Sequence, residues 1–276
     1  MTLTSTAEIV VAAARAGAGA GAFNVITIEH AEAIAQGADA ARRHAILQIS
    51  ENAVRYHGGL APIAAASLAV ARAAEMPISV HLDHATEPTL VREAIGLGVS
   101  SVMYDASALD YAANVAATAA IVALCHDAGV WVEAELGEVG GKDGVHAPGA
   151  RTDPGEARAF VARTGVDALA VAVGTSHAML TRDAVLDFDL IGALREAVPV
   201  PLVLHGSSGV PDDGLRHAVA CGIAKVNIGT QLNKAFTTAA RAYLAAEAHA
   251  VDPRTYLGAA RTAVAGEVAR LLAVLG

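Results

Sequence analysis

The chain repeats, eight times over, a short apolar segment followed by a longer amphipathic or alanine-rich segment, and no other feature constrains its fold as much. The short segments have the character of strands buried on both faces, and the longer segments have the length of helices. Many of the longer segments end at a glycine, as a left-handed helix cap requires. The expected strands are residues 22–25, 45–50, 77–83, 99–105, 130–136, 167–173, 201–205 and 224–229. Expected helices between them include residues 28–43, 62–75, 88–97 and 108–128.

Eight strands alternating with helices in 276 residues predict an α/β fold, a single (β/α)8 TIM barrel, with an open doubly wound sheet as the structural alternative. No linker or shift in composition divides the chain, so residues 1–276 are expected to form one domain. The longest expected loop, residues 137–153, is rich in glycine and longer than the usual connection in such folds. We expect it to be a mobile loop over the active site.

Composition and charge exclude several classes of function. The net charge of −9 argues against a nucleic-acid partner, because phosphate backbones are bound by basic surfaces. No apolar run approaches the ~20 residues of a membrane-spanning helix, so no membrane partner is expected. The N-terminal sequence lacks the basic and apolar regions of a signal peptide. We therefore expect a cytoplasmic protein, in which any small anion is held by a local site of amides, arginine or metal.

Polar residues stand at or just beyond the C-terminal end of each expected strand. In a barrel these ends meet on one face, and that face carries the active site. Eight polar strand ends in register would be an unusual coincidence in a purely structural scaffold. The residues are Asn24, Ser50, Asp83 with His84, Asp105, Glu135, Gly174 with His177, His205 and Asn227.

Three of these residues have the character of metal ligands. His84, His177 and His205 follow different strands, and three imidazoles with one open position are typical of a catalytic zinc site. A lone histidine is more often a capping or core residue, but three on one face beside acidic residues favour a metal. His81, inside the third strand, is interpreted as an interior packing residue or as a partner of a ligand.

Asp83 directly precedes His84, so its carboxylate is expected within a few ångströms of the ion. A bound metal polarises a carbonyl as a Lewis acid, and a carboxylate beside it can move a hydroxyl proton. The alternative, that Asp83 caps the next helix, is weaker because Thr86 and Glu87 before Pro88 already supply a helix start.

The segments 205–210 and 226–236 each combine a strand, small polar residues and a helix start, as a phosphate site requires. Covalent chemistry through a Schiff base would need a lysine in the site. Lys142 lies in the long loop, Lys225 is expected to enter the eighth strand from the end away from the site, and Lys234 to follow it on a helix. Metal chemistry therefore fits better.

Together these residues resemble the class II fructose-bisphosphate and tagatose-bisphosphate aldolases, over nearly the whole chain. The motifs that carry the resemblance are AFNV (22–25), QIS (48–50), HLDHA (81–85), MYDAS (103–107), EAELGEVGG (133–141), TDPGEA (152–157), VAVGTSH (171–177), LVLHGSSGVP (202–211), KVNIGT (225–230) and DPRTYLG (252–258).

The resemblance implies zinc held by His84, His177 and His205, with Asp83 as the catalytic acid/base. It places Asp105 and Glu135 at an alternative metal position or around the ligands. It also implies a homodimer or homotetramer, in which Arg254 meets the far phosphate from a neighbouring subunit, and a monovalent cation (Na⁺ or K⁺) near the phosphate. The other residues expected to contact the sugar phosphate are Asn24, Ser50, Gly206, Ser207, Ser208, Asn227, Ile228, Gly229 and Thr230.

Three positions depart from the pattern of the family. Ala178 stands where a glycine usually brings its amide to the phosphate, so its methyl group is expected at the substrate-binding pocket. The lysine usual shortly afterwards is missing, and Arg182 is the nearest positive replacement. The loop acid, usually a glutamate, is expected to be Asp143, with a catalytic role.

The function expected from these observations is reversible cleavage of fructose 1,6-bisphosphate to dihydroxyacetone phosphate and glyceraldehyde 3-phosphate. Tagatose 1,6-bisphosphate and another phosphorylated keto-sugar or keto-acid are alternative substrates. A sugar-phosphate-binding paralogue without activity is a different class of function, against which the three histidines and Asp83 argue. A metal-dependent barrel hydrolase is a third possibility. The chain lacks the paired His-x-His ligands expected of that class on an early strand.

Overall fold

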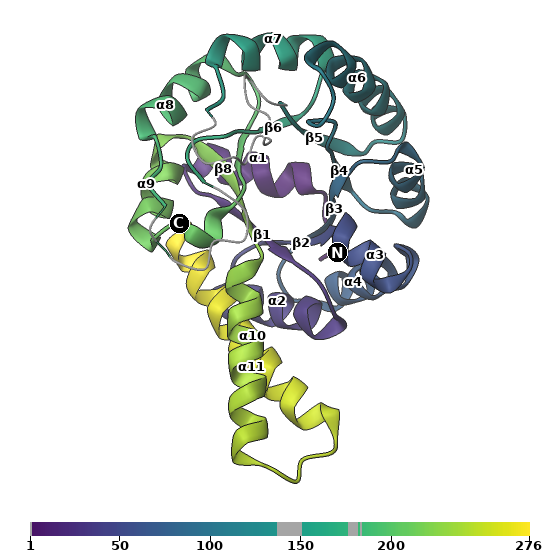
Figure 1. The fold of residues 1–276 in the computed structure, drawn as a ribbon, viewed down its shortest axis with the longest axis vertical. Helices are drawn as coiled ribbons and strands as arrows, with labels where there is room; N and C mark the ends of the chain where they lie inside the picture. Colours follow the sequence, from purple (N-terminus) through teal and green to yellow (C-terminus); the bar gives the residue numbers. More distant parts are fainter. Residues whose placement is uncertain (1, 137–150, 176–181, 183) are drawn as a thin grey trace.

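The computed structural model describes residues 2–136, 151–175, 182 and 184–276. Eight parallel strands close into a barrel in chain order, with β8 paired back to β1 (Figure 1). The predicted (β/α)8 barrel is thereby confirmed and the open sheet is excluded. The strands are β1 Ala20–Asn24, β2 Ala45–Ser50, β3 Ile78–Ala85, β4 Ser101–Tyr104, β5 Trp131–Glu135, β6 Ala168–Ala170, β7 Leu202–Leu204 and β8 Ile223–Ile228.

Helices surround the barrel, and α1 closes its N-terminal end (Figure 1). Ile9 and Val10 of α1 pack against small residues inside the barrel, such as Ala22 and Ala224, and so seal the end opposite the site. The helices are α1 Thr6–Ala16, α2 Ile28–Ala41, α3 Glu51–His57, α4 Ala61–Ala73, α5 Pro88–Leu97, α6 Tyr111–Asp127, α7 Pro154–Thr164, α8 Phe188–Ala197, the 3₁₀ turn η1 Ser207–Gly209, α9 Asp212–Cys221, α10 Thr230–Ala246 and α11 Pro253–Val274.

Several elements are shorter than their sequence pattern predicts. The expected helix 108–128 begins only at Tyr111, because the Asp110 side chain accepts from the amide of Ala113 and caps the first turn. The expected strands 99–105 and 201–205 end at Tyr104 and Leu204. Asp105 and His205 therefore directly follow the strands, although the amide of Asp105 still donates to the carbonyl of Ala85 in β3.

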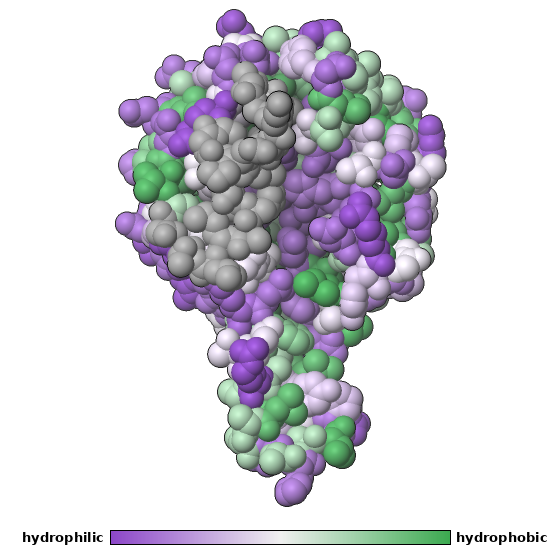
Figure 2. Space-filling model, in the orientation of Figure 1, coloured by the Kyte–Doolittle hydropathy of each residue, from purple (hydrophilic) through white to green (hydrophobic). Residues whose placement is uncertain are grey.

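Helices α10 and α11 form a hairpin that projects from the barrel as an arm (Figure 1). Figure 2 shows hydrophobic side chains gathered on this arm, and Leu244 and Val251 on it are exposed. Among the described residues, no helix combines the length and the apolar character needed to cross a membrane.

Gly37 allows α2 to pack closely on α11. A Cβ at this position would lie 2.7 Å from the carbonyl oxygen of Ala265 and 2.7 Å from Cβ of Val268, so neither backbone could stay in place. We expect Gly37→Ala to lower the free energy of unfolding by about 1–3 kcal/mol, the usual effect of overpacking. Urea denaturation measures this, and Gly192→Ala in α8, where a Cβ meets nothing within 4 Å, is the control. Equal midpoints for the two variants would contradict the packing argument.

Candidate active site

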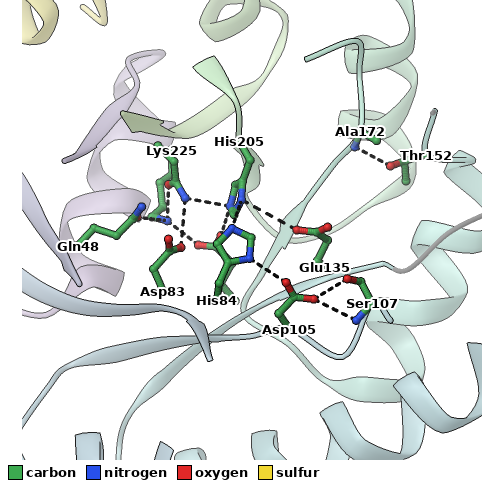
Figure 3. A network of polar contacts seen from close by, with 12 residues as sticks. Gln48, Asp83, His84, Asp105, Ser107, Glu135, Thr152, Ala172, His205 and Lys225 are labelled. Atoms are coloured by element: carbon green, nitrogen blue, oxygen red, sulfur yellow. Dashed lines mark hydrogen bonds and ion pairs between the residues drawn. The ribbon is translucent and has the colours of Figure 1, made fainter. Parts of the chain in front are cut away.

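The C-terminal ends of the strands bring the expected polar residues together over the barrel (Figure 3). Asp83 and His84 come from the end of β3, Glu135 ends β5, and Asp105 and His205 directly follow β4 and β7. Asp83, Glu135 and His205 are at most 3% exposed, which strengthens every electrostatic interaction among them.

An irregularity in β3 turns two consecutive side chains toward this site. Successive residues of a regular strand point to opposite faces, so Asp83 and His84 could not both face one point. The pairing of β3 with β4 shifts register between Leu82 and Ala85. Within this shift His84 has φ 51°, a left-handed conformation that costs a non-glycine residue on the order of 1–3 kcal/mol. Backbone strain is thus concentrated at a candidate metal ligand.

Asp105 orients the ring of His84. Its Oδ2 lies 2.8 Å from His84 Nδ1, and its Oδ1 accepts from the amide and the hydroxyl of Ser107. His84 therefore directs Nε2 into the site. Burial would lower the pKa of His84, but the carboxylates of Asp83, Asp105 and Glu135 raise it to about 10. Burial by itself would raise the pKa of Asp105. The hydrogen bonds from His84 and Ser107 outweigh it and hold this pKa well below its usual range. The site as a whole attracts a cation.

His205 faces His84 from the other side of the site. Its Nδ1 lies 3.1 Å from His84 Nε2 and 4.0 Å from the Glu135 carboxylate. Its Nε2 lies 2.8 Å from Glu133 Oε1, at a distance from which an N–H of His205 can donate a hydrogen bond to Glu133. Two imidazole nitrogens that face each other so closely need a proton or a cation between them.

The donor set fits a metal ion. Among the residues that the structure describes, two overlapping groups each place three ligand atoms within 4.8 Å of one another: Asp83, His84 and His205, and His84, Asp105 and Glu135. Two nitrogens bound to zinc at about 2.0–2.1 Å in a tetrahedron lie about 3.4 Å apart. The 3.1 Å between His84 Nε2 and His205 Nδ1 is close to this separation.

The segment after β7 carries small buried groups beside the site. Gly206 has φ 66°, a conformation that glycine adopts without strain, and this turn starts η1. Ser207 and Ser208 in η1 are buried, and the Ser207 hydroxyl donates to the backbone carbonyl of Asn227 in β8. The polar turn expected after the seventh strand thus lies against the end of the eighth.

The start of α10 is the second candidate anion site. Ile228 ends β8, Gly229 follows, and Thr230 begins the helix. Among the described residues no side chain caps this first turn, and the first amides of a helix attract an anion. A Cβ on Gly229 would lie 3.1 Å from Nδ2 of the Asn24 side chain, whose Oδ1 accepts a hydrogen bond from Nε2 of Gln48. A side chain at position 229 would therefore require the side chain of Asn24 to shift by a few tenths of an ångström.

Three other expected residues make contacts outside the cluster of acids and histidines, although Ser50 ends β2 in register with Asp83. The Ser50 hydroxyl caps α3 by accepting from the amide of Ala53. Arg254 lies in the first turn of α11, with its guanidinium bonded to Asp252. Arg182 donates to the carbonyl of Val210. The predicted residues Asp143, His177 and Ala178 lie outside the described residues, as does most of the predicted loop 137–153.

The expectation that Lys225 lies away from the site is wrong. It is wholly buried in β8, and its Nζ lies 2.8 Å from both Glu133 Oε2 and Asn227 Oδ1. A four-carbon side chain can reach from the strand entry to its exit, which the position in the sequence does not reveal. Sequence reasoning also missed Glu133. Its signal was present, because Glu133 and Glu135 are two residues apart on one strand and so share a face.

Comparisons with known proteins agree with this geometry. The family described as fructose-bisphosphate aldolase class-II matches residues 4–276. The crystal structure of the YdjI aldolase from Escherichia coli K12 is similar at 30% identity over 99% of this chain and 97% of that chain, with a TM-score of 0.88. A candidate fructose-1,6-biphosphate aldolase from Coccidioides immitis is similar at 29% identity over 98% of this chain and 96% of that chain, with a TM-score of 0.83.

Fructose-bisphosphate aldolase from Campylobacter jejuni, at 20% identity over 99% of this chain and 95% of that chain, shares the fold with a TM-score of 0.83. The match of the family over almost every residue, together with the acids and histidines at the strand ends, assigns both family and type of reaction. The chain belongs to the class-II fructose-bisphosphate aldolase family, whose members are generally metal-dependent, and it is an enzyme of the carbon–carbon lyase type.

Proposed function

We propose that this aldolase depends on zinc and reversibly cleaves a ketose 1,6-bisphosphate, with fructose 1,6-bisphosphate as the first candidate, to dihydroxyacetone phosphate and glyceraldehyde 3-phosphate. The observation that carries the proposal is the approach of His84 Nε2 and His205 Nδ1 to 3.1 Å beside buried carboxylates. His84, His205 and the predicted third ligand His177 would hold the ion, with Asp105 and Glu135 at a neighbouring position.

When bound, the metal supplies a Lewis acid for the substrate carbonyl. The protein supplies the proton transfer, which we assign to Asp83. Its carboxylate lies among the ligand atoms of His84 and His205, and its Oδ1 is 3.4 Å from the Asn227 amide. A carboxylate held there can take the proton of the sugar hydroxyl as the carbon–carbon bond breaks.

The phosphate of the dihydroxyacetone half would be held by the turn at Gly206–Ser208 and by the first amides of α10. Both segments adjoin the metal position through Asn227, and both present small residues that let backbone amides approach an anion. A monovalent cation near this phosphate and a catalytic Asp143 stay predictions, as does a cytoplasmic location.

A coupled assay of the purified enzyme with each ketose bisphosphate in turn tests the substrate. Tagatose 1,6-bisphosphate differs from the fructose compound only at C4, and discrimination depends on hydrogen bonds to one hydroxyl. Another phosphorylated keto-sugar or keto-acid is the remaining alternative. If the enzyme cleaves neither of the two bisphosphates, the proposed substrate class is rejected. The hypothesis of a non-catalytic binding protein is disfavoured, because the chain belongs to an aldolase family and keeps Asp83 beside the histidines.

We propose that the protein forms a homodimer or homotetramer, in which Arg254 completes the site of a neighbouring subunit. The projecting arm, with exposed Leu244 and Val251, offers a surface for such contacts. Within its own chain Arg254 is bonded to Asp252, and its side chain in the first turn of α11 is 89% exposed. We expect Arg254→Ala to raise the KM for the bisphosphate about 10- to 150-fold, because a charge-assisted phosphate contact is lost. Steady-state kinetics measures this.

Arg241→Ala, which removes another exposed charge from the same arm, is the control and should leave KM unchanged. Mixed oligomers of Arg254→Ala and Asp83→Ala subunits should recover part of the activity, because some sites then combine two intact halves. No recovery in verified mixed oligomers would show that Arg254 serves its own subunit or no site at all.

A further inference from the structure

We propose that Glu133 and Lys225 form a buried positioning pair, which keeps the proton of His205 on Nε2 and thereby directs Nδ1 of that ring at the metal. The inference rests on the metal site proposed above, and it concerns the two residues that the sequence did not predict. Neither residue touches the ion position directly. Both act through His205.

The geometry of Glu133 assigns the proton on His205. Its side chain is fully buried, with Oε1 2.8 Å from His205 Nε2 and Oε2 2.8 Å from Lys225 Nζ. A carboxylate in an ion pair can only accept hydrogen bonds. His205 Nε2 must therefore carry a hydrogen, and in the neutral ring Nδ1 then holds the lone pair that a metal needs.

Lys225 holds the acceptor in this orientation. Its ammonium group has three donors, and three oxygens surround it: Glu133 Oε2 and Asn227 Oδ1 at 2.8 Å, and Gln48 Oε1 at 3.3 Å. The same contact fixes the amide of Asn227. Its Nδ2 then turns toward Asp83 Oδ1, 3.4 Å away, although it also lies 3.0 Å from His205 Nε2. The ammonium group of Lys225 thus orients Glu133, which contacts His205, and Asn227, which contacts Asp83 (Figure 3).

Stability alone does not explain this pair. A buried ion pair is often no more stabilising than apolar side chains of the same volume, because both charges lose their hydration. The other buried positions in the barrel interior include Ala22, Ile46 and Met103, so apolar residues fill this space elsewhere. A partner that fixes the tautomer of a metal-binding histidine commonly changes metal affinity by about 10–100-fold. Positioning is therefore the role that the charges serve.

Glu133→Gln is the decisive variant, because Lys225 still requires an acceptor. The carbonyl of the new amide would turn to Lys225, and its NH₂ group would donate to His205 Nε2. The proton would then move to Nδ1, where it competes with the metal. We expect zinc affinity, measured by competition with a chelator, to fall about 10–100-fold. In metal-free protein, long-range ¹⁵N–¹H NMR should report the proton on Nε2 in the wild type and on Nδ1 in the variant.

The double variant Glu133→Gln/Lys225→Met provides the rescue. Without the ammonium the amide can rotate back and accept from Nε2, so zinc affinity should rise again above that of Glu133→Gln. Ser101→Ala is the matched control: its hydroxyl lies in the same barrel interior, 2.8 Å from His81 Nδ1 and 2.6 Å from the Thr6 hydroxyl. It should alter the unfolding temperature and leave zinc affinity unchanged. A purely structural pair would predict no rescue.

Two results would overturn the inference: zinc affinity of Glu133→Gln within about twofold of a zinc-binding wild type, or a wild-type His205 with its proton on Nδ1. The NMR measurement needs only metal-free wild type, so it decides the matter even if the variants fold poorly. A wild type that binds no zinc would reject the proposed zinc site instead, while the tautomer would still test the pair.

Discussion

Replacing Asp83 with alanine should lower the rate of aldol cleavage about 10²–10⁴-fold and leave zinc bound. The carboxylate is buried, and its ligand atom lies within 4.8 Å of those of His84 and His205. In the proposed site the histidines hold the ion, so its retention would separate proton transfer from metal binding. Turnover at saturating substrate and the zinc content of the same preparation are the two measurements.

Asp83→Asn keeps the size of the side chain and removes its charge, so it should lose activity almost as completely as the alanine variant. Asp110→Ala removes the cap of α6, away from the site, and should cost about 1 kcal/mol of stability without affecting turnover. An Asp83→Ala enzyme with turnover close to that of the wild type would exclude the acid/base role.

Removal of the metal should abolish cleavage, and added zinc should restore it. In the part of the chain that the structure describes, acids and imidazoles converge around His84 and His205, a donor set that suits a divalent cation. Chelation followed by metal analysis and assay tests this expectation. Full cleavage by protein without any bound divalent metal would reject the mechanism.

Borohydride added with substrate should trap no covalent adduct. A Schiff base needs a lysine with a free electron pair. All three donors of the Lys225 ammonium face oxygen acceptors, and Lys234 lies on α10. Mass spectrometry of the whole protein after reduction detects an adduct directly. An increase in mass equal to that of the reduced substrate would reverse the assignment to the metal-dependent class.

The sequence by itself determined the architecture and the face that carries the site. Period and composition decide whether a segment is a buried strand or a helix, and the strict alternation of the two permits few topologies. Because parallel strands in a barrel all end on one face, the residues at those ends could be grouped without any coordinates. Asp83, His84, Asp105, Glu135 and His205 are brought together as that argument predicts.

Only the tertiary structure decided which of these groups touch, and through which atoms. The left-handed turn at His84 depends on the register between β3 and β4, which no local pattern encodes. Lys225 was misplaced because its position in the strand says little about where a long side chain ends, and its true neighbours come from β2 and β5. The periodicity of a strand determines which face of the sheet a side chain is on. Which nitrogen of a histidine carries the proton depends on partners distant in sequence, and only the closed barrel brings those within hydrogen-bonding distance.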